Sequence, residues 1–241
     1  MTGTYSIEEL IPYISWEHFY HTWSVSRSGE ASADIKQDAL KLLASLPSDI
    51  KVNYLIKAYK VIVDTDDLVF EESGIRVPFL RQQIPNENGV CLCLTDYVGE
   101  TDGEISVFAT SADKRLEQMF PDDEYKGLLA KTLADRLAEA AAEKLHEDSG
   151  LKGVRPAVGY PSIPDLSINF LVNDICNLES IGIHLTETGM MMPHASVSGF
   201  ILSDPNSKYF AVRPISEEQL ADYAHRRGFS QERMRQFIYD R

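Results

Sequence analysis

The sequence predicts an α+β fold built on a largely antiparallel sheet. Candidate strands come in neighbouring groups joined by short turns, with helices between the groups, which is the pattern of such folds. A long helical stretch with an apolar residue at every fourth position must also bury that stripe. The 241 residues are 44% hydrophobic, enough for a substantial core, and no break in composition divides them. We therefore expect a single domain over residues 1–241, with residues 1–30 as an N-terminal segment that packs on it.

The first half of the chain predicts one helix and four strands. The helix is expected at residues 34–46, because Pro47 cannot continue it. The expected strands are rich in β-branched and aromatic residues, and an aspartate-rich turn joins the first pair. The turn within the second pair, residues 98–103, carries glycines at both Gly99 and Gly103. The strands are expected at residues 52–63, 67–72, 89–97 and 104–110.

The second half begins with the clearest helix, at residues 122–147. This helix follows Pro121 and has acidic residues in its first turn, which suit a helix N-terminus. Its apolar stripe consists of Leu129, Leu133, Leu137, Ala141 and Leu145. The remaining expected elements are a helix at residues 167–178, strands at 182–188, 197–203 and 209–215, and helices at 217–227 and 231–239.

Charge and hydropathy argue against several classes of function. A net charge of −14 argues against nucleic-acid binding, because a phosphate backbone requires a basic surface. No apolar stretch approaches the ~18 residues that a membrane span requires, and the N-terminus lacks the features of a signal peptide. Three cysteines are too few for a disulfide scaffold. We therefore expect a cytoplasmic protein that binds neither nucleic acid nor membranes.

Common catalytic and metal motifs are missing from the sequence. It contains no Gly-x-Gly-x-x-Gly turn, no Walker-type phosphate loop and no Gly-x-Ser-x-Gly elbow. His18 and His21 have a spacing that zinc ligands on a helix can use, but no convincing third and fourth ligands accompany them. We expect no metal site and no catalytic acid or base.

The stretch Arg155–Pro161, Arg-Pro-Ala-Val-Gly-Tyr-Pro, is the strongest indication of a ligand site. The guanidinium of Arg155 can pair a carboxylate through two parallel hydrogen bonds. The prolines keep the stretch extended, and Gly159 lets a ligand approach the backbone. Tyr160 adds an aromatic face with a hydroxyl at its rim. These features suit a small ligand with a carboxylate and an aromatic base, although a proline-rich surface turn fits the same residues.

This stretch and several further blocks resemble the activation (reactivation) domain of cobalamin-dependent methionine synthase. The blocks occur in the order of the family and cover nearly the whole chain, which is far more specific than any single motif. The further blocks are His21–Trp23, Leu80–Gln83, Ala134–Ala140, Ala195–Gly199, Asp204–Val212, Ala221–Ala224 and Arg226–Gly228.

The resemblance implies a C-shaped single domain around a long twisted sheet, with S-adenosylmethionine (AdoMet) as its ligand and methyl donor. The carboxylate of AdoMet then pairs with Arg155, and the adenine reads backbone N–H and C=O groups from Ala157 to Tyr160, which we expect to be free. Tyr160 faces the sulfonium or the ribose, because a cation is stable over an aromatic ring. The residues implied to bind AdoMet are Ser15, Glu139, Arg155, Ala157, Gly159, Tyr160, Tyr209 and Phe210.

Glu139 has two interpretations. Periodicity alone favours a solvated side chain, because Glu139 projects nearly opposite the leucine stripe of its helix. The resemblance instead implies that its carboxylate lies near the positive end of the ligand, where it offsets the charges of the sulfonium and the ammonium.

Two departures from the family pattern concern charge at the site. Ser15 stands where the family generally has an aspartate that contacts the ligand. The connection before Arg155 is short, and Ser149 replaces an acidic residue that is usual there. Asp148 or Glu147 is the candidate substitute for that acid. If nothing replaces the two carboxylates, binding is expected to weaken by roughly 1–3 kcal/mol.

In the family this domain is the last module of a long enzyme. The present sequence lacks the Asp-x-His-x-x-Gly motif that supplies a cobalt-ligating histidine, so we expect the cobalamin on a methionine synthase module or corrinoid protein acting in trans. The resemblance implies a methyltransferase component that is inactive without this partner. A flavodoxin-like donor reduces cob(II)alamin, and the reduced cobalt takes the methyl group of AdoMet. The alternatives are a docking or regulatory protein that has lost methyl transfer, and a structural homo-oligomer with a vestigial pocket.

Overall fold

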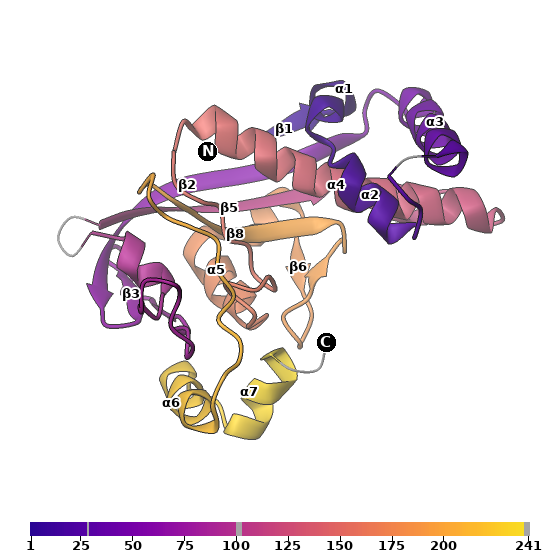
Figure 1. Cartoon of the computed structure of the whole chain (residues 1–241). Coiled ribbons are helices and arrows are strands. Elements are labelled where there is room, and N and C mark those ends of the chain that lie inside the picture. The colour runs from indigo at the N-terminus through magenta and orange to yellow at the C-terminus, as the bar shows by residue number, and fades with distance from the viewer. Residues whose placement is uncertain (28, 100–102, 239–241) are drawn as a thin grey trace.

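The computed structural model describes residues 1–27, 29–99 and 103–238 and has an antiparallel sheet at its centre (Figure 1). The strands of this sheet follow the order β4-β3-β2-β5-β8, and β1 also pairs with β2. Each of these pairings is antiparallel, which confirms the predicted α+β class. The strands are β1 (Thr2–Ser6), β2 (Lys51–Asp64), β3 (Asp67–Phe70), β4 (Arg76–Pro78), β5 (Gly103–Ala112) and β8 (Ser196–Leu202), with a separate hairpin of β6 (His184–Leu185) and β7 (Met191–Met192).

The helices agree closely with the predicted ones in the second half of the chain. They are α1 (Ile7–Leu10), α2 (Trp16–Thr22), α3 (Glu30–Ser45), α4 (Glu124–Ser149), α5 (Ile168–Cys176), α6 (Glu217–Arg227) and α7 (Gln231–Ile238). Residue 239, the last of the expected closing helix, lies outside the described residues, as do residues 100–102 of the expected turn. In the described ranges, none of the helices has both the length and the apolar character needed to cross a bilayer.

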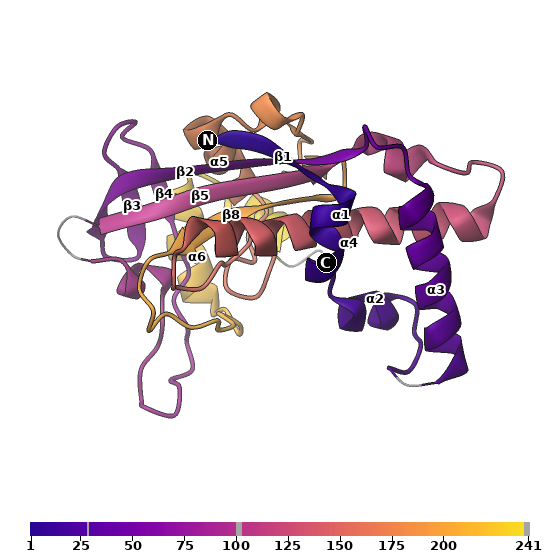
Figure 2. The ribbon, with the colours of Figure 1, turned by 90° about the horizontal axis from the view of Figure 1, so that it is seen from above.

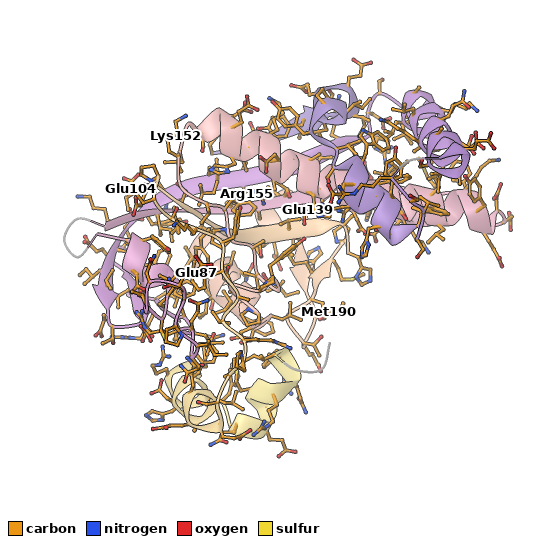
Figure 3. The ribbon with its side chains drawn as sticks, in the orientation of Figure 1. Glu87, Glu104, Glu139, Lys152, Arg155 and Met190 are labelled. Atoms are coloured by element: carbon orange, nitrogen blue, oxygen red, sulfur yellow. The ribbon has the colours of Figure 1, made fainter. Side chains whose placement is uncertain are left out.

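The sheet separates two hydrophobic cores. Alternate residues of β5 point to opposite faces, so that Phe108 packs with α4 and Val107 packs with α5. The predicted apolar stripe of α4 is buried as expected. Figures 1 and 2 show α4 running alongside β2, β5 and β8, and Figure 1 shows α5 across the sheet from α4 and α6 and α7 at the far end of the molecule. Arg155, the first residue of the predicted ligand stretch, lies between α4 and that far end (Figure 3).

The N-terminal segment contributes to the core beside α4. β1 pairs with β2 along Thr2–Ser6, and the side chains of Leu10 and Phe19 are fully buried in the same cluster as α4. The segment therefore places α2 against α4, next to the ligand stretch.

The prediction of a strand at residues 89–97 is wrong. Leu92 accepts a hydrogen bond from the backbone N–H of Gln82, and the side chain of Asp96 accepts from the N–H of Cys93, which turns the chain into a 3₁₀ helix at Leu94–Tyr97. The physical reason is that β5, the strand expected to pair with this segment, already has β2 on one side and β8 on the other.

The prediction of a strand at residues 209–215 is also wrong, because the bonds of this segment go to different neighbours. The carbonyl of Phe210 accepts from the hydroxyl of Ser162, and the N–H of Val212 donates to the carbonyl of Pro161. The strand expected at 182–188 is reduced to the two residues of β6. The irregular 209–215 segment nevertheless crosses beside the ligand stretch.

Candidate functional site

The ligand stretch lies beside the outer edge of β8. The N–H of Val158 donates to the carbonyl of Ser198 at 2.9 Å, and the N–H of Phe200 donates to the carbonyl of Pro156 at 3.0 Å. A side chain at Gly199 would collide with the carbonyl oxygen of Pro156, so a glycine is required for this close approach. The stretch is therefore held rigidly to the sheet.

Most of the backbone groups expected to be free are already engaged. Besides Val158, the N–H of Gly159 donates to the carbonyl of Ile163 at 2.8 Å, and the N–H of Tyr160 donates to the carbonyl of Ala157 at 3.3 Å. Gly159 has a φ of 87°, a conformation that favours glycine and lets the chain turn back here. The prediction that this backbone is free to read a base is wrong for these groups, because the turn consumes them.

Two adjoining cavities, of about 410 Å³ and about 430 Å³, meet at Glu139, Arg155 and Tyr160, which line both. In Figure 3 Glu139 and Arg155 both lie below α4, on the side that faces α6 and α7. The first cavity is largely apolar, and its other lining residues are Pro156, Ala157, Pro161, Ser162, Tyr209 and Phe210. The second is more polar, and its other lining residues are Tyr13, Ser15, His18, His21, Thr22, Arg136 and Glu143.

Arg155 is 9% exposed and keeps unused hydrogen-bonding capacity. Its Nη2 donates to Oε2 of Glu143 at 3.3 Å, and its guanidinium lies 5.2 Å from the ring centre of Phe108. Its Nε is buried and has no partner among the described residues. A buried cation paired with a largely exposed carboxylate is costly, and a ligand carboxylate in either cavity would give its terminal nitrogens a further partner.

Tyr160 and Glu139 form a hydrogen-bonded pair where the cavities meet. The hydroxyl of Tyr160 donates to Oε1 of Glu139. Burial, followed by the nearby charge of Glu139, raises the pKa of Tyr160, so its hydroxyl stays protonated at neutral pH. Glu139 is thus half-buried at the cavity wall rather than a simple solvated residue of α4. The proximity of Glu139 to the positive end of a ligand stays a prediction.

Sequence reasoning missed Glu143, the carboxylate that pairs with Arg155. The expected substitutes point elsewhere, since Asp148 accepts from the hydroxyl of Tyr5 at 2.7 Å and Glu147 bonds to Tyr13. The available signal was helical spacing: Glu143 follows Glu139 by four residues and shares its face of α4. The same face carries Arg136, which lines the second cavity and was also missed.

Ser15 lies in the second cavity and also begins α2. Its hydroxyl accepts from the N–H of His18 at 3.4 Å, the bond of a helix N-cap. His18 and His21 share this cavity with Ser15. Across residues 1–27, 29–99 and 103–238 the structure contains no group of three or more histidine, cysteine and acidic side chains able to hold a metal ion.

A family model and a solved structure both match this chain over most of its length. The family described as vitamin B12 dependent methionine synthase, activation domain, matches residues 6–150 and 148–228. The chain belongs to this family. The crystal structure of the MetH reactivation domain bound to AdoHcy is similar over 99% of this chain and 88% of that chain, with 28% sequence identity and a TM-score of 0.88. The predicted resemblance and fold class are thereby confirmed.

Within this activation-domain fold, seven of the eight residues predicted to bind ligand line one or both cavities. Gly159 is the exception, because it forms the turn behind them. The residues come from α4, from the Arg155–Pro161 stretch, from the irregular 209–215 segment and from the start of α2. These four segments converge only in the folded chain.

Proposed function

We propose that this chain binds AdoMet across the two cavities and supports the reductive methylation of cob(II)alamin held by a separate cobalamin module. The observation that carries the proposal is the nearly buried Arg155, which lines both cavities and has the largely exposed Glu143 as its ion-pair partner. The bound AdoHcy in the similar MetH reactivation domain supports a ligand of this class.

The character of each cavity suits one part of AdoMet. The apolar cavity, with Pro156, Pro161 and Phe210, suits the adenosine. Arg155 suits the carboxylate, and Glu143 lies 3.3 Å from Arg155, in position for the neighbouring ammonium. The sulfonium then lies at the junction, beside the ring of Tyr160 and the carboxylate of Glu139.

In this proposal the chain acts by positioning rather than by acid–base chemistry. The reduced cobalt supplies the nucleophile, and the S–CH₃ bond of AdoMet breaks as the methyl group moves to cobalt, leaving AdoHcy. Arg155 holds the carboxylate end of the methionine part of AdoMet, and Glu139 lies at its sulfonium end. Tyr160 keeps its proton and borders the sulfonium. Alignment of two bound reactants can lower a barrier by about 7–11 kcal/mol in the best cases.

The partners in this proposal follow from the reaction. A cobalamin-binding methionine synthase module or corrinoid protein must present the cobalt, on the same or on another polypeptide. A flavodoxin-like protein is the proposed donor of the single electron that converts cob(II)alamin into the nucleophilic state.

The test combines the chain with a corrinoid module loaded with cob(II)alamin, a reduced flavodoxin and AdoMet labelled in its methyl group. We expect label on cobalt, and its accumulation should require the chain and an intact Arg155. A chain that binds the corrinoid module while no label is transferred would favour the docking alternative. A chain that does not bind AdoMet would overturn the proposal.

A further inference from the structure

Helix α4 carries a histidine near Arg155, His146, that the proposed reaction does not use. His146 follows Glu143 by three residues, so both lie on the side of α4 that faces Arg155. The described chain has six buried side-chain nitrogen or oxygen atoms without a hydrogen-bond partner. Nε2 of His146 and Nε of Arg155 are two of them, and the two side chains interact electrostatically.

The unpaired nitrogens are chemically complementary. Nε of an arginine always carries a hydrogen, so it can only donate. Nε2 of a neutral histidine accepts whenever the other ring nitrogen, Nδ1, holds the proton. The backbone of Leu151 and Gly153 favours the protonated imidazole of His146, and Nε2 is the ring nitrogen that is buried without a partner. A proton on Nδ1 leaves this buried Nε2 as an acceptor.

The charge state of the imidazole fits this arrangement. Burial, and then the positive charge of Arg155, lower the pKa of His146, while Glu143 and the backbone of Leu151 and Gly153 act in the opposite direction. The net shift is downward, so the ring is neutral at pH 7. A protonated ring would set a second cation against the guanidinium.

We propose that His146 is a positioning residue for Arg155, whose Nε–H donates to Nε2 of His146 through one bridging water. Fixing the Nε edge of the guanidinium turns its two terminal nitrogens toward the cavities, where a carboxylate can bind both. The role of the ligand in this inference rests on the proposed function. The pairing of the two nitrogens does not depend on it.

The first test compares two ligands that differ in the amino-acid end. AdoHcy has the carboxylate, and 5′-methylthioadenosine lacks it. We expect His146→Leu to weaken AdoHcy binding about tenfold, the effect of one hydrogen bond to a charged group, and to leave methylthioadenosine binding unchanged. His146→Gln offers an amide oxygen as acceptor and should restore most of the AdoHcy affinity. His184→Leu, at an exposed histidine, is the matched control and should change neither.

If His146 has a purely structural role, His146→Leu would lower the affinity for both ligands alike, and that result would overturn the inference. Equal AdoHcy affinity in the wild type and His146→Leu would also overturn it.

The second test needs no ligand, so it separates this inference from the proposed function. In ¹⁵N-labelled protein we expect Nδ1 of His146 to carry the proton and Nε2 to be unprotonated, with the Nε2 resonance moving in Arg155→Ala. A protonated Nε2, or a resonance indifferent to Arg155→Ala, would contradict the inference even if AdoHcy binds well. If the wild type binds no AdoHcy, the proposed function fails and this spectrum still decides the role of His146.

Discussion

The hydroxyl of Tyr209 bonds to both backbone groups of Arg155. Its oxygen lies 3.1 Å from the backbone nitrogen of Arg155, which donates to it, and 3.2 Å from the carbonyl oxygen, to which it donates. Tyr209 is 63% exposed, and its hydroxyl makes both of these bonds. The 209–215 segment thereby fixes the start of the ligand stretch.

Tyr209→Phe should loosen the backbone at Arg155. It removes two hydrogen bonds and leaves an N–H unpaired, so we expect the Arg155 amide to exchange its hydrogen faster and the free energy of unfolding to fall by about 1 kcal/mol. Hydrogen exchange measured by NMR gives the first quantity. Tyr125→Phe removes a hydroxyl bonded to Asp38, away from the cavities, and should leave the Arg155 amide unchanged. Unaltered exchange in Tyr209→Phe would show that its hydroxyl does not hold the backbone.

Ser15→Asp should strengthen AdoMet binding. An aspartate at this position restores a negative charge to the second cavity, and it still caps α2, because aspartate is as good an N-cap as serine. A gain of a few-fold is expected, since a partly solvated charge pair contributes up to about 1 kcal/mol. Isothermal titration with AdoMet measures the gain, and Ser15→Asn caps the helix without the charge. Equal affinities for the two variants would exclude a charge effect.

Glu139→Gln should discriminate between AdoMet and AdoHcy. The proposed position of Glu139 beside the sulfonium predicts a loss of affinity for positively charged AdoMet and a smaller loss for AdoHcy, which has a neutral sulfur. The difference is expected to be several-fold, about 1 kcal/mol at the effective dielectric of a partly exposed site. Parallel titrations with both ligands measure it. If both affinities fall equally, Glu139 does not face the sulfonium.

His146 should make the stability of the fold depend on pH. Its pKa in the folded chain lies below the usual value of 6.5, so its contribution is fully present above that value and is lost as the pH falls through the folded pKa. Urea unfolding from pH 7.5 to pH 5 should show a declining free energy of unfolding, with a shallower decline in His146→Gln. The same slope in both proteins would mean that other groups cause the decline.

The sequence predicted the elements whose pattern is local. The leucine stripe of α4 and the acidic residues near its start were sufficient to predict that helix. Helix α6 has its predicted bounds, 217–227, and is capped by Ser216 and Gly228. The strand expected at 89–97 failed because alternation cannot show whether a sheet edge is free. The N–H groups of Leu92 and Cys93 donate to the side chains of Gln82 and Asp96, which the pattern does not weigh.

The site itself was predictable only in part. The Arg155–Pro161 stretch indicated a carboxylate partner from residue chemistry alone, and the resemblance added Glu139 and Tyr209. Glu143 was missed, because pairing it with Arg155 requires knowing that the segment after α4 folds back along that helix. The burial of Nε2 of His146 without a partner could not be predicted either, because the burial of a single atom depends on the whole fold.

The most direct test is equilibrium binding of labelled AdoMet to the wild type, Arg155→Ala and Arg115→Ala. Arg115 pairs with Asp49 and Asp113 and does not line either cavity, so its variant controls for the loss of a cation. We expect Arg155→Ala to bind AdoMet at least tenfold more weakly, because charge-assisted hydrogen bonds are lost, and Arg115→Ala to bind it normally. Undiminished AdoMet binding by Arg155→Ala would contradict the proposed role of Arg155.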